Sequence, residues 1–500
     1  MENIFENPQK YIQKLRNIHL IDTKKIKDFS GKSIAVIFLT KYCNADCKFC
    51  IYKSPRKKNK NESTNNELTE IGIQKCIEFI NNSNIGYLLI SGGGEPFLKL
   101  SHIFNLIENV KTEEIVIVSN GFWGANLEKA LEILNNMEKI QKKRHIKITI
   151  RISVDKWHTE KLGTNHIKNI INIFSKNYTS NKNFKLKIHT IADDNTILDI
   201  IGKYNFNIKS QKKYSSDNEV LNKSNRHRMI IELINGYELE IEFAKLFHPN
   251  LEVNLNNNIN EQLKVFNEDL TQSQAGNFST VLNSDNTKGL DYLINYNGNI
   301  STWANYQTYN SPNIYYDNRK DIINKLYGDI ISYSFLKEPL KFIIKVVEEV
   351  NPIAVKRSIG INIRDYFGMY LLYEHKTLLY YYVKLLKRYL YKDILINLNK
   401  LPIEIKEIIK LEDKKIIELY NKSEYNIFSQ YKEKKFSEEE WEDLFFLIDK
   451  GHFPINKMQV KEGLCYYNKH TEQKYSTYKD IIKKCNINNR YERLLKMFNV

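Results

Sequence analysis

Short apolar, β-branched segments alternate with helical patterns through the first half of the chain, and this alternation constrains the fold most. The segments expected to form strands are 33–39, 86–91, 114–119, 147–154, 185–192 and 237–243. Helices are expected from about 67, around 102–111 and over 126–141. Strands and helices that alternate at intervals of roughly 30 residues build parallel sheets with helices outside. The pattern predicts an α/β fold with a partial, (β/α)6-type barrel, whose chemistry lies at the carboxyl ends of its strands.

The second half of the chain has a different pattern. Residues 250–288 are polar and rich in asparagine, and Asn297-Gly298 separates two apolar runs in 292–303, which predicts a β-hairpin. From about residue 318 the periodicity is helical. We expect four parts: an N-terminal helical segment (1–30), the partial barrel (31–250), a linker with the hairpin (251–317) and a helical C-terminal domain (318–500).

Composition excludes several classes of protein. A chain of 500 residues is too long for one core, and 19 glycines with 9 prolines are too few for a collagen-like or linker-rich architecture. The net charge of +16 comes from lysines spread through the chain, loops included, so it does not single out nucleic acid as a partner. The N-terminus lacks the apolar run of a signal peptide, and no long apolar stretch is free of charge. We expect a cytoplasmic protein with no membrane partner.

Three of the 6 cysteines stand together directly after the first predicted strand. Cys43, Cys47 and Cys50 have the spacing C-x3-C-x2-C. A structural zinc site needs a fourth ligand, and no second cysteine pair accompanies these three. Three thiolates on a short loop suit a [4Fe–4S] cluster whose fourth iron position stays open. A zinc or simple electron-transfer site remains the alternative.

This cysteine motif, with Phe49 before its last member, resembles the radical S-adenosylmethionine (radical SAM) superfamily. The resemblance extends from about residue 33 to residue 250. It implies one [4Fe–4S] cluster and bound S-adenosylmethionine (SAM). It further implies that SAM is cleaved reductively to a 5′-deoxyadenosyl radical, which abstracts a substrate hydrogen. An oxygen-sensitive enzyme of this kind takes its electron from a donor such as flavodoxin or ferredoxin.

Further motifs of the superfamily follow at the ends of the next strands. The second strand ends in Ser-Gly-Gly-Gly-Glu-Pro (91–96), where the missing Cβ atoms let the backbone approach a ligand closely. By the resemblance, polar residues after the third and fourth strands hold the ribose and the methionine carboxylate of SAM. The expected cofactor contacts are Phe49, Gly92, Gly93, Gly94, Glu95, Ser119, Asn120, Ser153 and Asp155. For the polar residues, simple strand-end capping remains the alternative.

Asp155 and His158 are the candidate catalytic residues, because a carboxylate and an imidazole together at a barrel mouth suit substrate contact or proton transfer. A structural histidine is an equally good interpretation of His158. Cys76 lies on the apolar face of its predicted helix and is expected in the core. Cys465 and Cys485 are too isolated for a cluster; either could donate a hydrogen atom, but a structural role is favoured.

The region around the predicted hairpin bears on the substrate. Many peptide-modifying relatives carry an extension with a hairpin and cysteines that bind auxiliary clusters. Residues 292–303 resemble the hairpin, but no cysteine lies between Cys76 and Cys465, and Trp303 stands near the expected first ligand. A degenerate extension, a single cluster and a ribosomally made peptide or a small molecule as substrate are therefore expected. Modification of RNA or a nucleotide is one alternative, and a non-catalytic iron–sulfur redox sensor or binding protein is another.

Overall fold

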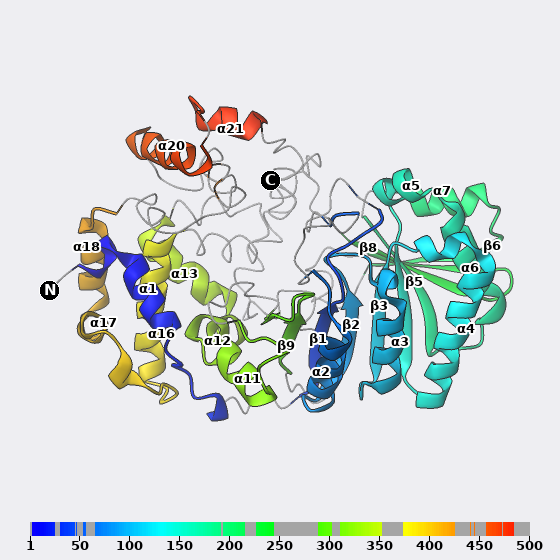
Figure 1. The fold of residues 1–500 in the computed structure, drawn as a ribbon, viewed down its shortest axis with the longest axis horizontal. Helices are drawn as coiled ribbons and strands as arrows, with labels where there is room; N and C mark the ends of the chain where they lie inside the picture. Colours follow the sequence, from blue (N-terminus) through cyan, green and yellow to red (C-terminus); the bar gives the residue numbers. More distant parts are fainter. Residues whose placement is uncertain are drawn as a thin grey trace.

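The structure is a computed structural model, and it shows an α/β part and a helical part (Figure 1). It describes residues 3–25, 31–45, 47, 54–56, 66–191, 194–215, 227–244, 289–302, 311–352, 374–425, 441, 445, 457–472 and 474–484.

Ten strands form a single sheet. They are β1 (Ser33–Phe38), β2 (Ile85–Ser91), β3 (Glu114–Ser119), β4 (Lys147–Ser153), β5 (Phe184–Ile191), β6 (Ile208–Ser215), β7 (His227–Leu233), β8 (Glu238–Ala244), β9 (Asp291–Ile294) and β10 (Ile300–Ser301). Their order is β10-β9-β1-β2-β3-β4-β5-β8-β7-β6. The six predicted strands are β1 to β5 and β8, and they pair in parallel in that order. The predicted α/β fold with a partial barrel is confirmed.

Two features of the sheet were not predicted. β6 and β7 extend it beyond β8 as an antiparallel pair, with the β7–β8 turn at Gly236. The predicted hairpin exists as β9 and β10, but β9 also pairs in parallel with β1. The hairpin is therefore part of the main sheet. Its turn contains Gly298, whose φ of 84° lies in the left-handed region that glycine adopts readily.

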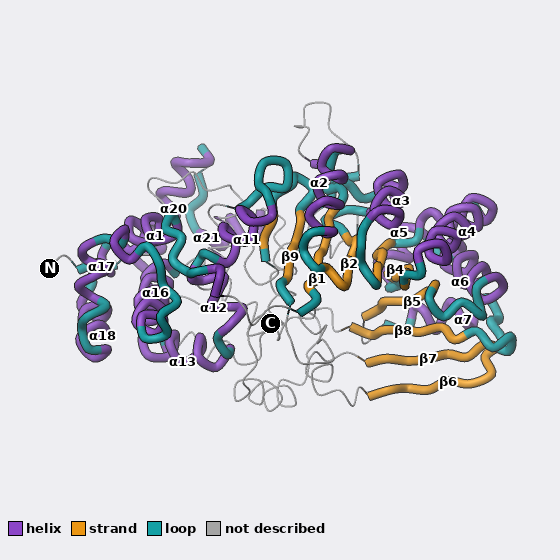
Figure 2. The backbone as a smooth tube through the Cα atoms, turned by 90° about the horizontal axis from the view of Figure 1, so that it is seen from below, coloured by secondary structure: helices purple, strands orange, loops and turns teal. Residues whose placement is uncertain are grey.

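Helices that connect the parallel strands cover one face of the sheet (Figure 2). The connecting helices are α2 (Glu70–Asn81), α3 (Leu100–Asn109), α4 (Leu127–Arg144), α5 (Lys156–Leu162), α6 (Asn165–Asn177) and α7 (Thr196–Lys203). The side chains of Thr69 and Asn126 accept hydrogen bonds from backbone N–H groups in the first turns of α2 and α4. Such caps fix the points at which these helices begin.

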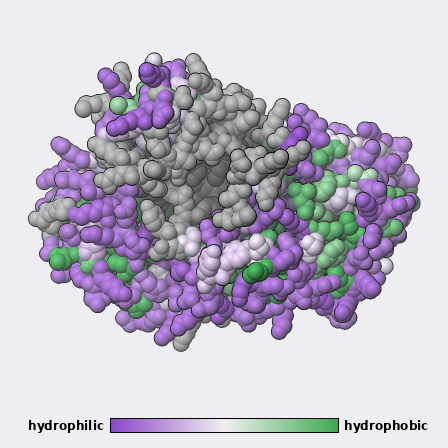
Figure 3. All heavy atoms as spheres, viewed as in Figure 1, coloured by the Kyte–Doolittle hydropathy of each residue, from purple (hydrophilic) through white to green (hydrophobic). Residues whose placement is uncertain are grey.

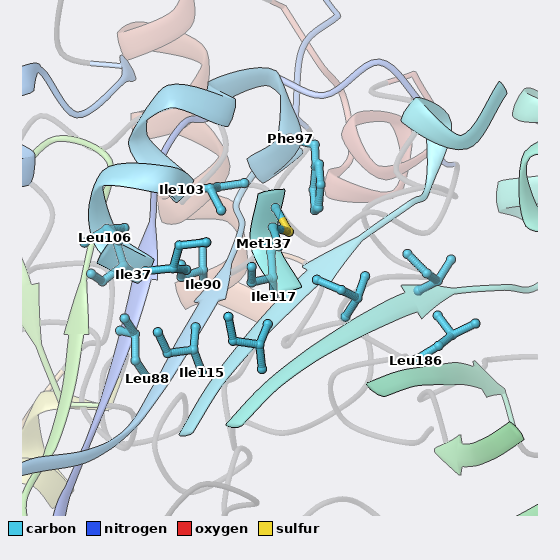
Figure 4. Packing of buried hydrophobic residues seen from close by; sticks show 14 of the residues in the cluster. Ile37, Leu88, Ile90, Phe97, Ile103, Leu106, Ile115, Ile117, Met137 and Leu186 are labelled. Atoms are coloured by element: carbon cyan, nitrogen blue, oxygen red, sulfur yellow. The ribbon is translucent and has the colours of Figure 1, made fainter. Parts of the chain in front are cut away.

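The main core lies between the sheet and these helices. Side chains of Ile37, Ile90 and Ile117 on three neighbouring strands pack towards Leu106 of α3, and Met137 of α4 adds to the same cluster (Figure 4). Cys76 of α2 is also fully buried in this cluster, as predicted. Burial of such side chains supplies most of the driving force for folding.

The opposite face of the sheet changes character across its width. On β1, β2, β3 and β9 it carries a second apolar cluster, composed of Ile34, Val36, Phe38, Leu89, Val116 and Leu293. From β4 onward, the residues that alternate with the buried isoleucines are polar or charged. On β4 they are Thr149, Arg151 and Ser153. One half of this face is therefore apolar, and the other half is polar.

The remaining helices form the other end of the molecule. They are α1 (Pro8–Arg16), α12 (Ile330–Lys337), α13 (Leu340–Val350), α16 (His375–Leu390), α17 (Ile403–Ile408), α18 (Asp413–Lys422), α20 (Lys457–Thr471) and α21 (Tyr478–Lys484), together with the 3₁₀ helices η1 (Ile4–Glu6) and η7 (Leu398–Lys400). N-terminal and C-terminal segments share one hydrophobic cluster here, and α1 packs on α16. Helix α11 (Arg319–Tyr327) packs into the main core instead. The other 3₁₀ helices are η2 (Thr23–Lys25), η5 (Pro96–Lys99) and η6 (Phe122–Ala125).

The tyrosine-rich segment of the sequence is the core of this helical part. Tyr380, Tyr381 and Tyr382 of α16 are fully buried. The hydroxyl of Tyr381 donates to Ser334 Oγ over 2.8 Å, and that of Tyr380 donates to Glu349 Oε2 over 2.5 Å. These tyrosines pack inside the protein, so they offer no surface on which RNA bases could stack.

The surface of the described part is largely hydrophilic on the face that Figure 3 draws, with hydrophobic residues showing between polar ones over the α/β end. Within the described ranges, no helix has both the length and the apolar character that crossing a bilayer requires.

Two isoleucines of α2 test how much the main core contributes to stability. Ile73 is 0% exposed, whereas Ile71 is 68% exposed. We predict that Ile73→Ala lowers the free energy of unfolding by about 2–5 kcal/mol, because it removes buried methyl groups and leaves a cavity. The matched variant Ile71→Ala should change it by less than about 0.5 kcal/mol. Chemical denaturation monitored by circular dichroism measures both, and equal losses would contradict the assignment of the core.

Candidate functional site

The loops that follow β1, β2, β3 and β4 lie together at one edge of the sheet (Figure 1). The register pairs Phe38 with Ser91 and Ser153 with His189, so these neighbouring parallel strands end at the same level. The cysteine loop, the glycine loop and the polar residues after β3 and β4 are therefore neighbours, as the sequence predicted.

The glycine loop packs directly on the backbone of the cysteine loop. Glu95 N donates to Tyr42 O over 2.8 Å. A Cβ atom on Gly94 would lie 2.1 Å from Tyr42 O, and one on Gly92 would lie 1.8 Å from Gly94 O. Gly93 is buried between them. At Gly92 and Gly94, glycine is thus required because the protein's own backbone approaches too closely for any side chain.

The carboxylate of Glu95 ties the glycine loop to the end of β3. Its side chain is only 3% exposed. Oε1 accepts hydrogen bonds from Ser119 Oγ at 2.8 Å and from Phe97 N at 3.0 Å, and Oε2 accepts one from Asn120 N at 2.8 Å. Both oxygens are occupied by internal donors, which makes Glu95 a link between the two loops.

Burial raises the pKa of Glu95 to about 7, against the opposing effect of these hydrogen bonds and of nearby His158. Desolvation therefore outweighs the three donors, because the charged carboxylate loses its water almost completely. Glu95 titrates near neutrality as a result.

Ser119 and Asn120, at the end of β3, form further hydrogen bonds that connect Glu95 to Trp123 and to the cysteine loop. Ser119 Oγ accepts from Trp123 Nε1 at 3.1 Å, and the Trp123 ring stacks on Phe97 with centroids 4.7 Å apart. Asn120 Nδ2 donates to Asn44 Oδ1 at 2.9 Å and to Cys43 Sγ at 3.8 Å. The end of β3 thus reaches back to the cysteine loop. Asn44 was not singled out in the sequence, although it stands inside the cysteine motif.

Asp155 caps helix α5 and binds His158. Asp155 Oδ1 accepts from the N–H groups of Trp157 and His158, both at 3.0 Å, and Oδ2 lies 2.6 Å from His158 Nδ1. The His158 side chain is also hydrogen-bonded to that of Cys47. The structure therefore places both candidate catalytic residues beside the cysteine loop, at the expected edge.

The pKa values of this pair follow from the same contacts. Burial disfavours the charged form of His158, but the Asp155 carboxylate and Cys47 outweigh it and raise its pKa to about 10. Burial likewise acts against ionisation of Asp155, yet the His158 charge and the capping hydrogen bonds hold the pKa of Asp155 below its usual range. The pair is therefore an ion pair at neutral pH.

A further carboxylate at this edge was missed. Asp194 follows β5 and accepts hydrogen bonds from Lys156 N at 3.0 Å and from Thr196 N at 2.8 Å. It fixes the start of α5 from the neighbouring strand. Its position directly after a predicted strand was the available signal, the same one that identified Asp155.

Two of the three predicted cluster ligands lie in the described part of the chain. Neither Cys43 nor Cys47 is in a disulfide bond, and both are partly exposed. Cys43 Sγ accepts hydrogen bonds from Ala45 N at 3.4 Å and from Asn120. Phe49, Cys50, Trp303 and Cys485 lie outside the described residues. No group of three metal-binding side chains occurs among the residues that are described. N–H donors directed at a partly exposed thiol are what a cluster-bound thiolate needs, so the residues present fit a [4Fe–4S] cluster.

Ser153, His189 and Cys465 are not among the residues that form the hydrogen bonds described above. Ser153 ends β4 on the polar half of the sheet, opposite His189, and both are partly buried. Cys465 is exposed in the helical part.

Residues 29–168, which contain the cysteine loop, the glycine loop and Asp155, match a protein family described as a 4Fe-4S single cluster domain. The resemblance to the radical SAM superfamily is confirmed. The match also agrees with the predicted single [4Fe–4S] cluster.

Two individual proteins are similar to the chain. A protein of Bacillus subtilis (strain 168), described as "Putative peptide biosynthesis protein YydG", is 31% identical over 137 residues, which cover 27% of this chain and 40% of the relative. The chain thus matches less than half of the length of this curated relative. A solved structure of a hexahistidine-tagged protein, described as "anSMEcpe with bound AdoMet", is 12% identical, with a TM-score of 0.33 over 76% of this chain and 98% of that one.

The buried carboxyl of Glu95 gives a prediction for the dependence of stability on pH. Its pKa is about 7 in the folded chain, against an ordinary value of 4.5. The folded state therefore holds this proton more tightly than the unfolded state. The stability that Glu95 contributes is fully present below pH 4.5 and is lost as the pH rises through 7, by up to about 3 kcal/mol.

Glu95→Gln should remove this contribution, so that the variant loses less stability than the wild type between pH 5 and pH 8. Urea denaturation at a series of pH values measures the difference. The exposed Glu132→Gln on α4 is the control and should leave the wild-type pH profile unchanged. Parallel profiles for wild type and Glu95→Gln would contradict a raised pKa at Glu95.

Proposed function

We propose that the chain is a radical SAM enzyme that cleaves SAM reductively at a [4Fe–4S] cluster and abstracts a hydrogen atom from a ribosomally made peptide. The observation that carries the proposal is the contact among the motif loops. Glu95 bonds to Tyr42, Asn120 bonds to Asn44 and Cys43, and these contacts lie within the segment that matches a 4Fe-4S single cluster domain.

In this proposal Cys43, Cys47 and Cys50 hold the cluster. When bound, the cluster and SAM supply the electron and the 5′-deoxyadenosyl radical that removes a substrate hydrogen. Gly92 to Gly94 present backbone groups beside the cysteine loop, and Phe49 and Ser153 contact SAM. Glu95, Ser119 and Asn120 position these loops, since their polar atoms are occupied by one another.

Asp155 and His158 act as a pair at the same edge. Asp155 fixes the imidazole through Nδ1, and the His158 side chain is also hydrogen-bonded to Cys47. We propose that this pair orders the start of α5 beside the cysteine loop and holds a proton near the substrate. Asp194 supports it through Lys156 N.

A peptide substrate is supported by the relative in Bacillus subtilis, which is described as a peptide biosynthesis protein. The β9–β10 hairpin is present, and no cysteine accompanies it in the sequence before Cys465. One cluster, an electron donor such as flavodoxin or ferredoxin, and a cytoplasmic location complete the proposal.

Cysteine substitutions test the cluster and its chemistry. We predict that Cys43→Ala, Cys47→Ala and Cys50→Ala each abolish binding of a stable [4Fe–4S] cluster and the formation of 5′-deoxyadenosine from SAM, because no other thiol lies in the loop. Iron and sulfide analysis, absorption spectra and chromatography after anaerobic reduction with dithionite measure these effects.

The exposed Cys465→Ala is the matched control and should keep both the cluster and the activity. Zinc in place of iron in anaerobically purified protein would contradict the cluster assignment. A cluster without any cleavage of SAM in the wild type would instead favour a redox sensor.

Ser153→Ala tests the proposed contact with SAM at the end of β4. Loss of one hydrogen bond to a charged group should raise the dissociation constant for SAM by about tenfold, with unchanged iron content. Ser101→Ala on the exposed surface of α3 is the control. Equilibrium dialysis with the oxidised, reconstituted protein measures the constant, and equal affinity in Ser153→Ala would exclude the contact.

A further inference from the structure

Arg151 of β4 stands out on the polar half of the sheet. Ile150 and Ile152 on either side of it point into the main core, so Arg151 points to the face away from the helices. Its side chain is partly buried, and its Nε atom is buried without a hydrogen-bond partner. Among the residues that the structure describes, none forms a hydrogen bond or an ion pair with the side chain of Arg151.

An unpaired guanidinium in such a position is unusual. Desolvation of a cation costs free energy unless an anion or several acceptors compensate for it. The cross-strand neighbours of Arg151 offer no compensation, since they are Val118 on β3 and Lys187 on β5. Lys187 already pairs with Glu240 of β8, with Nζ and Oε1 3.0 Å apart. Among the described residues, therefore, no carboxylate pairs with the Arg151 guanidinium.

The position of Arg151 relates it to the proposed cofactor site. Arg151 lies two residues before Ser153 on the same face of β4, which places their Cα atoms about 7 Å apart along the strand. A group bound by Arg151 would therefore lie on the face of the sheet, two residues before the end of β4, close to the place where the cysteine and glycine loops meet. Arg151 also stands at the boundary between the apolar half of this face and its polar half, because the apolar cluster ends at β3.

The surrounding charges favour a single carboxylate over a polyanion. Glu240 and Glu242 lie on the same face of the sheet on β8, which is separated from β4 by β5, and Glu232 lies on β7. These carboxylates would repel a phosphate backbone, whereas one carboxylate can approach the guanidinium alone. Arginine binds a carboxylate through two parallel N–H···O bonds, which gives strength and direction.

We propose that Arg151 is a substrate-recognition residue that binds a carboxylate of the peptide substrate, an acidic side chain or the C-terminus, close to the residue that is modified. This proposal rests on the proposed function, because it takes the peptide to enter along this face of the sheet. It assigns Arg151 to the substrate and Ser153 to SAM.

The test uses the full chain with its cluster reconstituted anaerobically and kept oxidised, so that SAM is bound without being cleaved. The probes are the tripeptides acetyl-Gly-Glu-Gly-amide and acetyl-Gly-Gln-Gly-amide, with their affinities measured by isothermal titration calorimetry. We expect the wild type to bind the glutamate peptide at least about tenfold more tightly than the glutamine peptide. Arg151→Gln should abolish this preference, and Arg151→Lys should keep part of it.

Arg228→Gln is the matched control, since Arg228 is an exposed arginine on the same face that already lies 3.5 Å from Glu240. It should retain the preference. Wild-type protein that shows no preference, or binds neither peptide at millimolar concentration, overturns the proposal. So does a loss of SAM affinity in Arg151→Gln without peptide, which would assign Arg151 to the carboxylate of SAM. Loss of poly(U) binding in Arg151→Gln would favour RNA instead and also overturn it.

Formation of 5′-deoxyadenosine by the same preparation separates this outcome from failure of the proposed function. If SAM is cleaved but the peptide preference is absent, only the role of Arg151 is wrong. If SAM is not cleaved while the preference is present, the carboxylate site stands and the radical chemistry does not.

Discussion

The candidate site depends on one buried carboxylate. Glu95 accepts hydrogen bonds from the loop that follows it and from two residues at the end of β3, while its own N–H bonds to the cysteine loop. Three loops that are far apart in the sequence are thereby held at one edge of the sheet. The raised pKa shows that burial costs more than these hydrogen bonds return. Burial therefore favours the protonated form of Glu95, while its hydrogen bonds fix how the three loops meet.

The two faces of the sheet differ in the side chains that they carry. Helices cover one of its faces. On one half of the other face, apolar side chains of β1, β2, β3 and β9 form a small buried cluster. The other half of this face, from β4 onward, carries Arg151, Lys187 and Glu240 in neighbouring positions on β4, β5 and β8. The face away from the helices therefore offers mostly apolar side chains on one half and polar groups on the other.

Local patterns predicted the parallel strands, because a strand buried on both faces reads as a continuous apolar run. They also predicted the order of the motifs and the edge at which Asp155, Asn120 and the glycine loop meet. They did not predict β6 and β7, or the pairing of β9 with β1, since the partner of a strand depends on contacts that are distant in the sequence. The hydrogen bonds of Glu95 to Ser119, Asn120 and Tyr42 could not be predicted for the same reason, because these partners are distant in the sequence. The assignment of Cys43, Cys47 and Cys50 as cluster ligands stays a prediction, and Cys50 lies outside the described residues.

Many lysine and arginine side chains of this basic protein are paired with carboxylates of the same chain, and this pairing limits what they can bind. The net charge of +16 gave no clear indication of a partner, and many of the cations prove to be engaged within the chain. In the helical part, Lys384 and Lys387 both contact Asp413 at 2.6 Å. Arg388 and Lys392 both contact the buried carboxylate of Glu338. Cations that are neutralised in this way contribute little to long-range attraction of a polyanion. Arg151, whose side chain pairs with no described residue, is a more specific signal than total charge, because the desolvation of a cation costs free energy unless an anion compensates for it.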